Sequence, residues 1–354
     1  MNVTRRDLRF LAAALGVSAF GDAFAQTGAP AGGASPAPSS DPLALVDPEL
    51  RAGAAQVMQW PALTAENLLA ARARNVLPQP LPPPAPTVNV RSIPGKRGDP
   101  DVGVEVIGVK SADRLRPAIV HMHGGGYIVA RAANMTAFCQ EVSADLDCVV
   151  VNVDYRLAPE TPFPGSMEDN YAALKWLHRN AASLGVDRGK IAVMGESAGG
   201  GHAAILAIAA RDRGEVPIRY QVLIYPMLDD RIGGARRVPP HIGALGWTET
   251  RNQFGWSSFL GMPAGSAAPP YGAVPARVED LAGLPPAFIG VGAIDLFVDE
   301  DIEYARRLVN AGVATQVHVV PGAYHAFDFV APQARVSREF TSAWKSALRA
   351  AFAG

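Results

Sequence analysis

The pattern that most restricts the fold is an alternation of short apolar segments with segments of helical character. The apolar segments begin at residues 117, 148, 190, 220, 286 and 315, and helices are expected at 132–145, 166–180, 197–211, 299–311 and from 333. Residues 87–93 and 102–109 contain interleaved polar residues, which predicts an antiparallel pair of strands. Strands that are apolar throughout are typical of a parallel sheet buried on both faces. The sequence therefore predicts an α/β fold with a mostly parallel eight-stranded sheet and helices on both faces.

Residues 191–211, IAVMGESAGGGHAAILAIAAR, contain several glycines where a helix should begin. A glycine inside a helix costs about 1 kcal/mol relative to alanine, so these glycines need another explanation. Gly195-Glu196-Ser197-Ala198-Gly199 fits the pattern G-x-S-x-G, a tight turn that exposes a nucleophilic serine between a strand and a helix. Side chains two residues before and after the serine would collide with neighbouring main chain. The patterns of a P-loop and of a dinucleotide fingerprint are missing here, which leaves a purely structural turn as the alternative.

A second glycine run, His123-Gly124-Gly125-Gly126, follows the strand expected at 117–123. A carbonyl under attack by serine develops negative charge on its oxygen and needs hydrogen-bond donors there. Glycines leave the main-chain N–H groups open to such an oxygen, and the N–H of Ala198 would be a further donor. A merely flexible turn does not explain why the run stands at this place relative to Ser197.

A nucleophilic serine needs a base, and the base needs an orienting carboxylate, which follow the serine in the chain order Ser, Asp or Glu, His. His325 follows the last predicted strand at the appropriate edge of the sheet, unlike the other downstream histidines (His202, His241 and His318). Asp295 comes directly after the preceding strand and is the preferred acid, with Asp299 as the alternative. Asp299, Glu300 and Asp301 are expected to open the following helix, where acidic groups favour the helix dipole.

The composition limits the partners of the chain. A net charge of −1 over 354 residues gives no indication of binding to nucleic acid or to an anionic membrane surface. Cys139 and Cys148 are expected as free thiols, although a disulfide between them is chemically feasible in an exported protein. His121 and His123 share one face of a strand but have no further metal ligands at suitable spacing. We therefore expect no metal and no cofactor.

The first residues resemble an export signal, with Arg5 and Arg6, an apolar run over 8–20 and the small-residue site Ala23-Phe24-Ala25. We expect a signal peptide over 1–25 that uses the Tat route, which makes the protein periplasmic or secreted without stable membrane insertion after cleavage. An uncleaved anchor is the alternative. A flexible linker is expected over 26–41, a helical cap region over 42–86 and a catalytic domain over 87–354. The oligomeric state stays open, and a dimer is allowed.

Taken together, these motifs resemble the hormone-sensitive-lipase-like family of bacterial esterases (family IV, the GDXG lipolytic enzymes), which have the α/β-hydrolase fold. The resemblance runs from about residue 87 to the C-terminus and rests on HGGGY (123–127), VDYRLAPETPFPGSMED (153–169), GESAGG (195–200), IDLFVDED (294–301) and PGAYHAF (321–327). It implies a triad and an oxyanion hole, formed by Ser197, Asp295 and His325 and by the amides of Gly125, Gly126 and Ala198. It also implies structural roles for Asp154, Tyr155, Arg156 and Glu168, and an N-terminal cap over the site, with walls near Met58, Trp60, Trp247 and Phe254.

The sequence departs from the family pattern at Glu196, Leu296 and Ala326, none of which removes a catalytic group. We therefore expect a serine esterase that acts on small-molecule carboxylic esters, of short to medium acyl length or with small aryl or alkyl groups, through an acyl-enzyme intermediate. An amidase, a lactonase or an acyltransferase with the same triad is the alternative among enzymes. A non-catalytic binding protein with this fold is the alternative from another class.

Overall fold

The computed structural model describes residues 41, 43–73, 79–110 and 114–354 of the chain. The predicted signal peptide and all but the last residue of the predicted linker lie outside these residues. Asp41–Gly354 form one compact unit, and the fold described below belongs to this unit.

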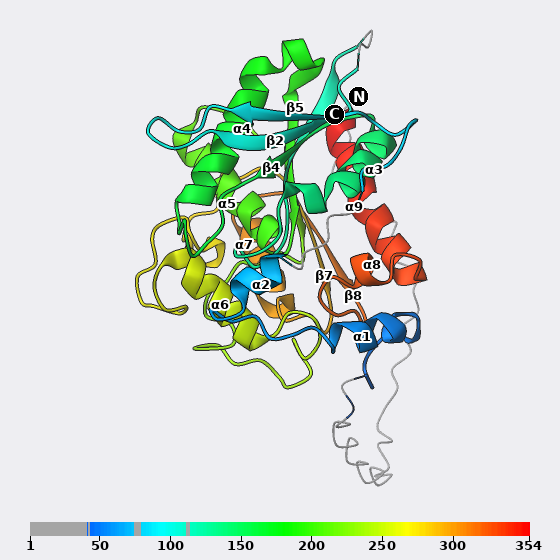
Figure 1. The fold of residues 1–354 in the computed structure, drawn as a ribbon, viewed down its shortest axis with the longest axis vertical. Coiled ribbons are helices and arrows are strands. Elements are labelled where there is room, and N and C mark those ends of the chain that lie inside the picture. The colour runs from blue at the N-terminus through cyan, green and yellow to red at the C-terminus, as the bar shows by residue number, and fades with distance from the viewer. Residues whose placement is uncertain (1–40, 42, 74–78, 111–113) are drawn as a thin grey trace, which may run out of the picture. The chain divides into compact units, whose positions relative to one another are not determined.

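The described residues contain a sheet of eight strands in the order β1-β2-β4-β3-β5-β6-β7-β8 (Figure 1). Strands β1 and β2 are antiparallel to each other, β2 is antiparallel to β4, and all other neighbours are parallel. This arrangement confirms the predicted sheet and its antiparallel pair. The strands are β1 (Val88–Ile93), β2 (Val102–Ile107), β3 (Arg116–Met122), β4 (Val149–Asp154), β5 (Val186–Glu196), β6 (Tyr220–Ile224), β7 (Ala287–Gly292) and β8 (Thr315–Val320).

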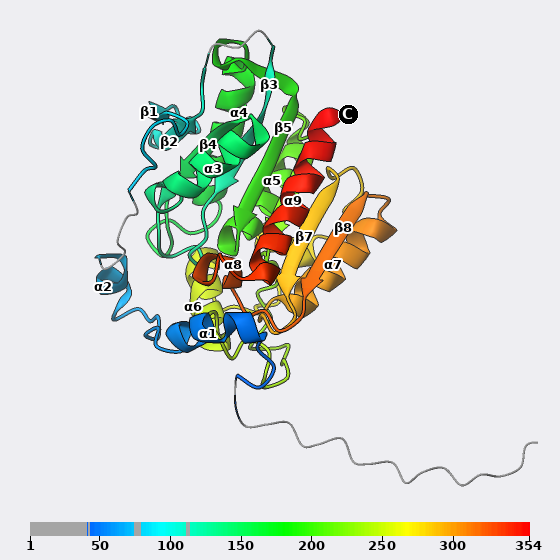
Figure 2. The ribbon, with the colours of Figure 1, turned by 90° about the vertical axis from the view of Figure 1, so that its right-hand side faces the viewer.

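Helices cover both faces of the sheet, as Figure 2 shows. One face packs against α4 (Gly165–Asn180), α5 (Ala198–Arg213) and α7 (Val298–Asn310), and the other packs against α3 (Thr136–Leu146) and α9 (Arg335–Ala353). Successive side chains of a strand point to opposite faces, so Val120 of β3 joins the first core and Ile119 joins the second. Both faces are covered, which explains why these strands are apolar throughout.

The N-terminal part of the unit contributes short helices. Within the helical cap region predicted over 42–86, the structure contains a 3₁₀ turn, η1 (Pro48–Leu50), followed by α1 (Arg51–Val57), and then α2 (Leu68–Ala73). Three further 3₁₀ turns are η2 (Ala132–Asn134), η3 (Ala182–Leu184) and η4 (Pro275–Arg277).

Two helices were not predicted. They are α6 (Glu249–Leu260), between β6 and β7, and α8 (Phe327–Val330), which begins two residues after His325. Figure 2 shows α1, α6 and α8 gathered at one end of the sheet. No residue of α6 from Arg251 to Leu260 is exposed, and several of the buried ones, such as Arg251, Asn252 and Ser258, are polar.

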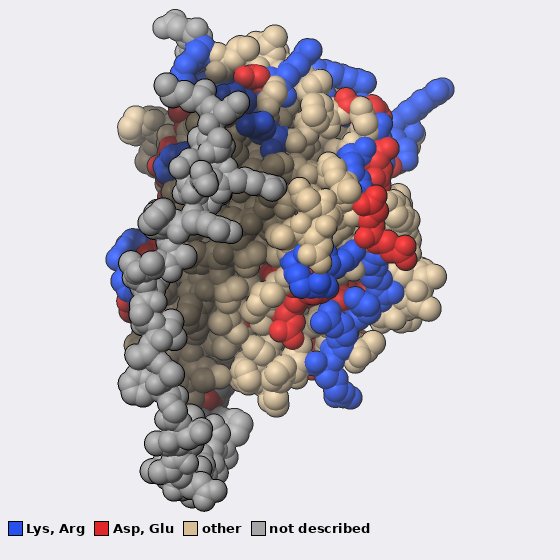
Figure 3. All heavy atoms as spheres, turned by 180° about the vertical axis from the view of Figure 1, so that it is seen from behind, with Lys and Arg blue, Asp and Glu red and all other residues tan. Residues whose placement is uncertain are grey.

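The face of the molecule seen in Figure 3 carries charged side chains of both signs. Seen from behind, lysine and arginine side chains lie among aspartate and glutamate side chains, with uncharged surface between them (Figure 3). In the described part of the chain, no helix combines the length and the apolar character needed to cross a membrane. Cys139 and Cys148 are buried free thiols, as expected.

Candidate active site

Ser197 lies on the sharp turn between β5 and α5. Its backbone has φ 58° and ψ −121°, a conformation that costs a residue with a side chain about 1–3 kcal/mol. A Cβ on Gly195 would lie 2.3 Å from the carbonyl carbon of Gly199, and a Cβ on Gly199 would lie 2.0 Å from the carbonyl oxygen of Met122. The two glycines are therefore required by close approach of main chain, as the pattern predicted.

His325 and Asp295 reach Ser197 from the ends of two other strands. His325 Nε2 lies 2.9 Å from Ser197 Oγ, and His325 Nδ1 lies 2.8 Å from Asp295 Oδ2. The other carboxylate oxygen of Asp295 accepts a hydrogen bond from the amide of Phe297 at 3.0 Å. A carboxylate on Nδ1–H leaves Nε2 free to accept the serine proton, which is the arrangement that general-base catalysis requires. Asp299 is exposed in the first turn of α7 and does not take part.

The glycine run after β3 lies against the serine turn. A Cβ on Gly124 would lie 3.4 Å from Ser197 Cβ. Gly125 and Gly126 have φ values of 119° and 58°, so their peptides adopt orientations that other residues rarely reach. Within the described residues, the amides of Gly125, Gly126 and Ala198 donate no hydrogen bond. Three main-chain donors next to Ser197 are thus available to an oxyanion.

Tyr155 holds His123, the first residue of the glycine run, in place. The Tyr155 hydroxyl donates to the carbonyl oxygen of His123 at 2.6 Å, and the two rings stack with centroids 4.1 Å apart. Burial lowers the pKa of His123 to about 4, so this ring is neutral at neutral pH. Tyr155 therefore has a structural role, as the sequence implied.

Glu196, the residue before the serine, belongs to a buried polar network. Its carboxylate lies 3.1 Å from His121 Nε2, and His121 Nδ1 lies 2.9 Å from Asn152 Oδ1. Asn152 Nδ2 donates a hydrogen bond to the Glu105 carboxylate at 2.9 Å, and the Thr136 hydroxyl donates to the same carboxylate. His121 thus has polar partners within the protein rather than the ligand role considered for it. In the described part of the chain, no cluster of three or more His, Cys, Asp or Glu side chains is placed to hold a metal ion.

A cavity of about 340 Å³ opens at the triad. The N-terminal segment supplies Trp60 and Pro61 to its wall, and the segment that leads to α6 supplies Trp247, as expected. Met58 and Phe254, also expected as walls, are not among the lining residues. The complete lining is Trp60, Pro61, Leu63, His123, Gly124, Gly125, Val129, Ala130, Asn134, Met135, Glu196, Ser197, Tyr225, Trp247, Arg251, His325, Ala326 and Phe329.

Sequence reasoning missed two residues beside the triad. Tyr225 packs edge-on against the His325 ring, with centroids 4.9 Å apart, and its hydroxyl donates to Asp328 at 2.9 Å. Burial raises the pKa of Asp328 to about 7, although the hydrogen bond from Tyr225 opposes the shift. In the sequence, Tyr225 stands out only as part of a Tyr-Pro pair after β6, and Asp328 only by its position three residues after His325. Neither feature indicates that Tyr225 and Asp328 are in contact.

Glu300 and Asp301 lie in the first turn of α7, as expected. Both side chains are buried there. Glu300 accepts hydrogen bonds from the amides of Leu228 and Asp229 at 2.6 and 3.2 Å. It therefore fastens the loop after β6 to α7. Burial raises the pKa of both carboxyl groups well above their usual range, which follows from the packing of α7 against the loop.

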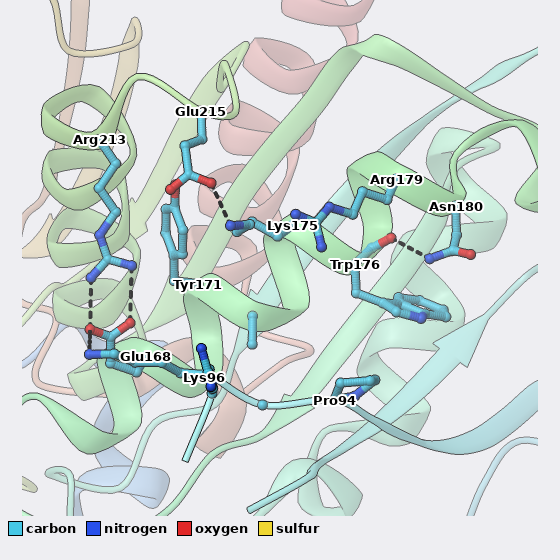
Figure 4. A pocket seen from close by; sticks show the side chains of 13 residues that line it. Pro94, Lys96, Glu168, Tyr171, Lys175, Trp176, Arg179, Asn180, Arg213 and Glu215 are labelled. Atoms are coloured by element: carbon cyan, nitrogen blue, oxygen red, sulfur yellow. Dashed lines mark hydrogen bonds and ion pairs between the residues drawn. The ribbon is translucent and has the colours of Figure 1, made fainter. Parts of the chain in front are cut away.

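A second cavity, of about 730 Å³, lies between the loop after β1 and helices α4 and α5 (Figure 4). Its charged groups largely pair with one another, as Arg213 does with Glu168 at 2.8 Å and Lys175 does with Glu215. None of its lining residues is a serine, a cysteine or a histidine. The cavity beside Ser197 is therefore the candidate active site.

A strained serine between a strand and a helix, a hydrogen-bonded histidine and aspartate, and free amides beside the serine define the class of α/β-fold serine hydrolases. Residues 119–329 match the family described as alpha/beta hydrolase fold, and the chain belongs to this family. The resemblance to hormone-sensitive-lipase-like esterases is thereby confirmed.

Related proteins carry esterase names. The chain is 35% identical over 243 residues to "Esterase LipI" of Mycobacterium tuberculosis, covering 67% of this chain and 74% of the relative. It is 34% identical over 214 residues to "Ethyl acetate hydrolase" of Pseudomonas putida, covering 59% and 65%. Among solved structures, "Bacterial Heroin Esterase" superposes with a TM-score of 0.76 at 34% identity, covering 87% of this chain and 98% of that one. The esterase LipW of Mycobacterium marinum gives 0.75 at 32% identity, covering 88% and 97%.

Proposed function

We propose that this protein is a carboxylic ester hydrolase in which Ser197 is the nucleophile. The observation that carries the proposal is the continuous hydrogen-bonded series from Ser197 Oγ through the His325 ring to Asp295. The esterase names of the relatives and of the similar structures support the same reaction class.

The geometry supports a two-step reaction. His325 Nε2 accepts the Ser197 proton while Oγ attacks the ester carbonyl, and the three free amides stabilise the resulting oxyanion. When the intermediate collapses, the alcohol leaves with the proton from Nε2 and the acyl group stays on Ser197. A water molecule then attacks the acyl-enzyme, with His325 again accepting a proton, and releases the carboxylic acid. Asp295 stabilises the imidazolium that forms in each step.

The size of the cavity supports substrates with short to medium acyl chains or small aryl or alkyl groups. Its volume of about 340 Å³ lies near the lower end of the range of about 300–1,000 Å³ for small-molecule sites. The aromatic and aliphatic residues of its wall suit an apolar substituent. Matched ester and amide substrates separate an esterase from an amidase with the same triad.

An organophosphonate probe tests the nucleophile, because it forms a stable bond only with an activated serine. We expect the wild-type protein to be labelled at Ser197 and to lose esterase activity in parallel. The Ser197→Ala variant should fold, escape labelling and lose several orders of magnitude in turnover. An unlabelled wild-type protein, or an alanine variant that keeps a tenth of the activity, would contradict the proposal.

We also propose that the protein is exported in folded form. The support is the sequence alone, with Arg5 and Arg6 before an apolar run and a small-residue site at 23–25. Replacing both arginines with lysine should leave active precursor in the cytoplasm of a bacterial host. Undiminished activity outside the cytoplasm in this variant would contradict the Tat route.

A further inference from the structure

Arg251 of α6 is a buried cation in the wall of the active-site cavity. The residue is only 8% exposed. Its Nη1 group donates to the carbonyl oxygen of Gly246, and its Nη2 group donates to the carbonyl oxygens of Trp60 and Pro61 at 3.0 and 2.7 Å. Its guanidinium also lies 5.9 Å from the centre of the Trp60 ring. All of these partners are uncharged.

No carboxylate lies within ion-pair distance of Arg251 among the described residues. Burial lowers its pKa, and no acidic group opposes that shift. A guanidinium nevertheless stays protonated in proteins. Arg116 and Arg277, which are also largely shielded from solvent, have Asp147 at 3.6 Å and Asp230 at 2.7 Å. Arg251 is therefore a buried charge without a counter-charge, which is costly unless a ligand supplies one.

The position of Arg251 connects this charge to catalysis. The carbonyl that Nη1 binds belongs to Gly246, and a Cβ on Gly246 would lie 3.4 Å from His325 Cβ. The next residue, Trp247, lines the cavity together with Trp60 and Pro61. Three hydrogen bonds use three of the five N–H groups of a guanidinium, so two remain for another acceptor. A cation is thus fixed in the otherwise mostly apolar wall of the cavity that also contains Ser197 and His325.

We infer that Arg251 binds a carboxylate on the substrate, so that the preferred substrates are esters with a negatively charged group in the acyl or the alcohol portion. The inference rests on the proposed esterase function and adds the substrate class. A carboxylate would supply the missing counter-charge, and guanidinium groups bind carboxylates with strong, directional hydrogen bonds. Recognition would orient the ester, because the charge is fixed relative to Ser197 and His325.

Arg251 also connects the N-terminal segment to α6, so a test must separate binding of substrate from this structural contact. Arg72 provides the matched control. It holds the N-terminal segment to the body through the carbonyl oxygens of Ile128 and Ala158 and through Glu160, but it does not line the cavity. Arg72→Met removes a comparable set of hydrogen bonds between the N-terminal segment and the body but leaves the charge in the cavity.

The experiment compares kcat/KM for two pairs of esters, each with one anionic and one neutral member. The first pair is 4-nitrophenyl hemiglutarate and 4-nitrophenyl pentanoate, and the second is 3-carboxyphenyl butanoate and phenyl butanoate. In at least one pair, Arg251→Met should lower the ratio of anionic to neutral kcat/KM by about tenfold or more, since a hydrogen bond to a charged group is lost. Arg251→Lys should keep part of the ratio, and Arg72→Met should leave it within about twofold of wild type.

Equal losses for both members of each pair in Arg251→Met would overturn the inference and leave a structural contact only. A wild-type enzyme that prefers the neutral member of both pairs would overturn it without any variant. Either outcome leaves the esterase proposal intact, because the neutral esters report hydrolysis by Ser197. Absence of hydrolysis of all four esters, together with absence of probe labelling, would instead contradict the proposed function.

Discussion

At the scale of single residues, the site consists of buried polar groups. Each forms a hydrogen bond with the next, which offsets the free-energy cost of its burial. Asp295 is fully buried, and its two oxygens are used by His325 Nδ1 and by the amide of Phe297. Asp299, four residues later, is exposed at the start of α7. The two aspartates share a charge and a short stretch of chain but differ completely in environment.

This difference predicts opposite results for two conservative variants. Asp295→Asn should lower kcat by up to about 10⁴-fold, by analogy with the aspartate of serine proteases, because the amide favours the wrong imidazole tautomer. Asp299→Asn should change kcat little and cost about 0.3–1 kcal/mol of stability, since it removes a charge near the helix N-terminus. Both variants are assayed on one neutral ester and by thermal unfolding. If Asp299→Asn were the inactive variant, Asp295 would not be the orienting acid.

At the scale of elements, helices α6 and α8 supply what the triad motifs do not contain. Arg251 belongs to α6, and Asp328 belongs to α8. Helix α6 has 12 residues and α8 has four, and helices shorter than about 12–15 residues are marginal on their own in water. Their conformation therefore depends on packing against the rest of the molecule. By contrast, α5 and α9 were expected within a few residues of their observed bounds because they are long and uninterrupted.

At the scale of the whole molecule, the N-terminal segment packs over the part of the chain that follows the last strand. Trp60 and Pro61 line the same cavity as His325 and Phe329, and Arg72 fastens α2 to the loop after the glycine run. Substrate access and the shape of the cavity thus depend on a segment outside the sheet.

The stability of the whole molecule should depend on the titration of Asp328. Its pKa is raised to about 7 in the folded state, compared with about 3.9 in an unfolded chain. The folded state therefore holds this proton more tightly, so the stabilisation is complete below about pH 4 and is lost as the pH rises through about 7. Because asparagine stays neutral, Asp328→Asn should show a smaller loss of stability against urea between about pH 4 and 7 than wild type.

Asp299→Asn serves as the control for this measurement, because its carboxylate is exposed, and it should retain the wild-type dependence on pH. The residue Asp328 is partly exposed, so water weakens the effect without changing its sign. Identical slopes of stability against pH in Asp328→Asn and wild type would show that this carboxyl group is ionised in the folded protein from acidic pH onward.

The sequence by itself determined the strands, the long helices and the triad, because these follow from local patterns. Buried strands require continuous apolar segments, and the turn at Ser197 requires glycine two residues before and after the serine. The tertiary structure alone decided the pairs Glu196–His121, Tyr225–Asp328 and Arg251–Trp60. The last pair joins residues 191 positions apart. Such contacts depend on the order of strands in the sheet and on the path of the loops at its edge. The local sequence around one residue therefore does not identify its distant partner.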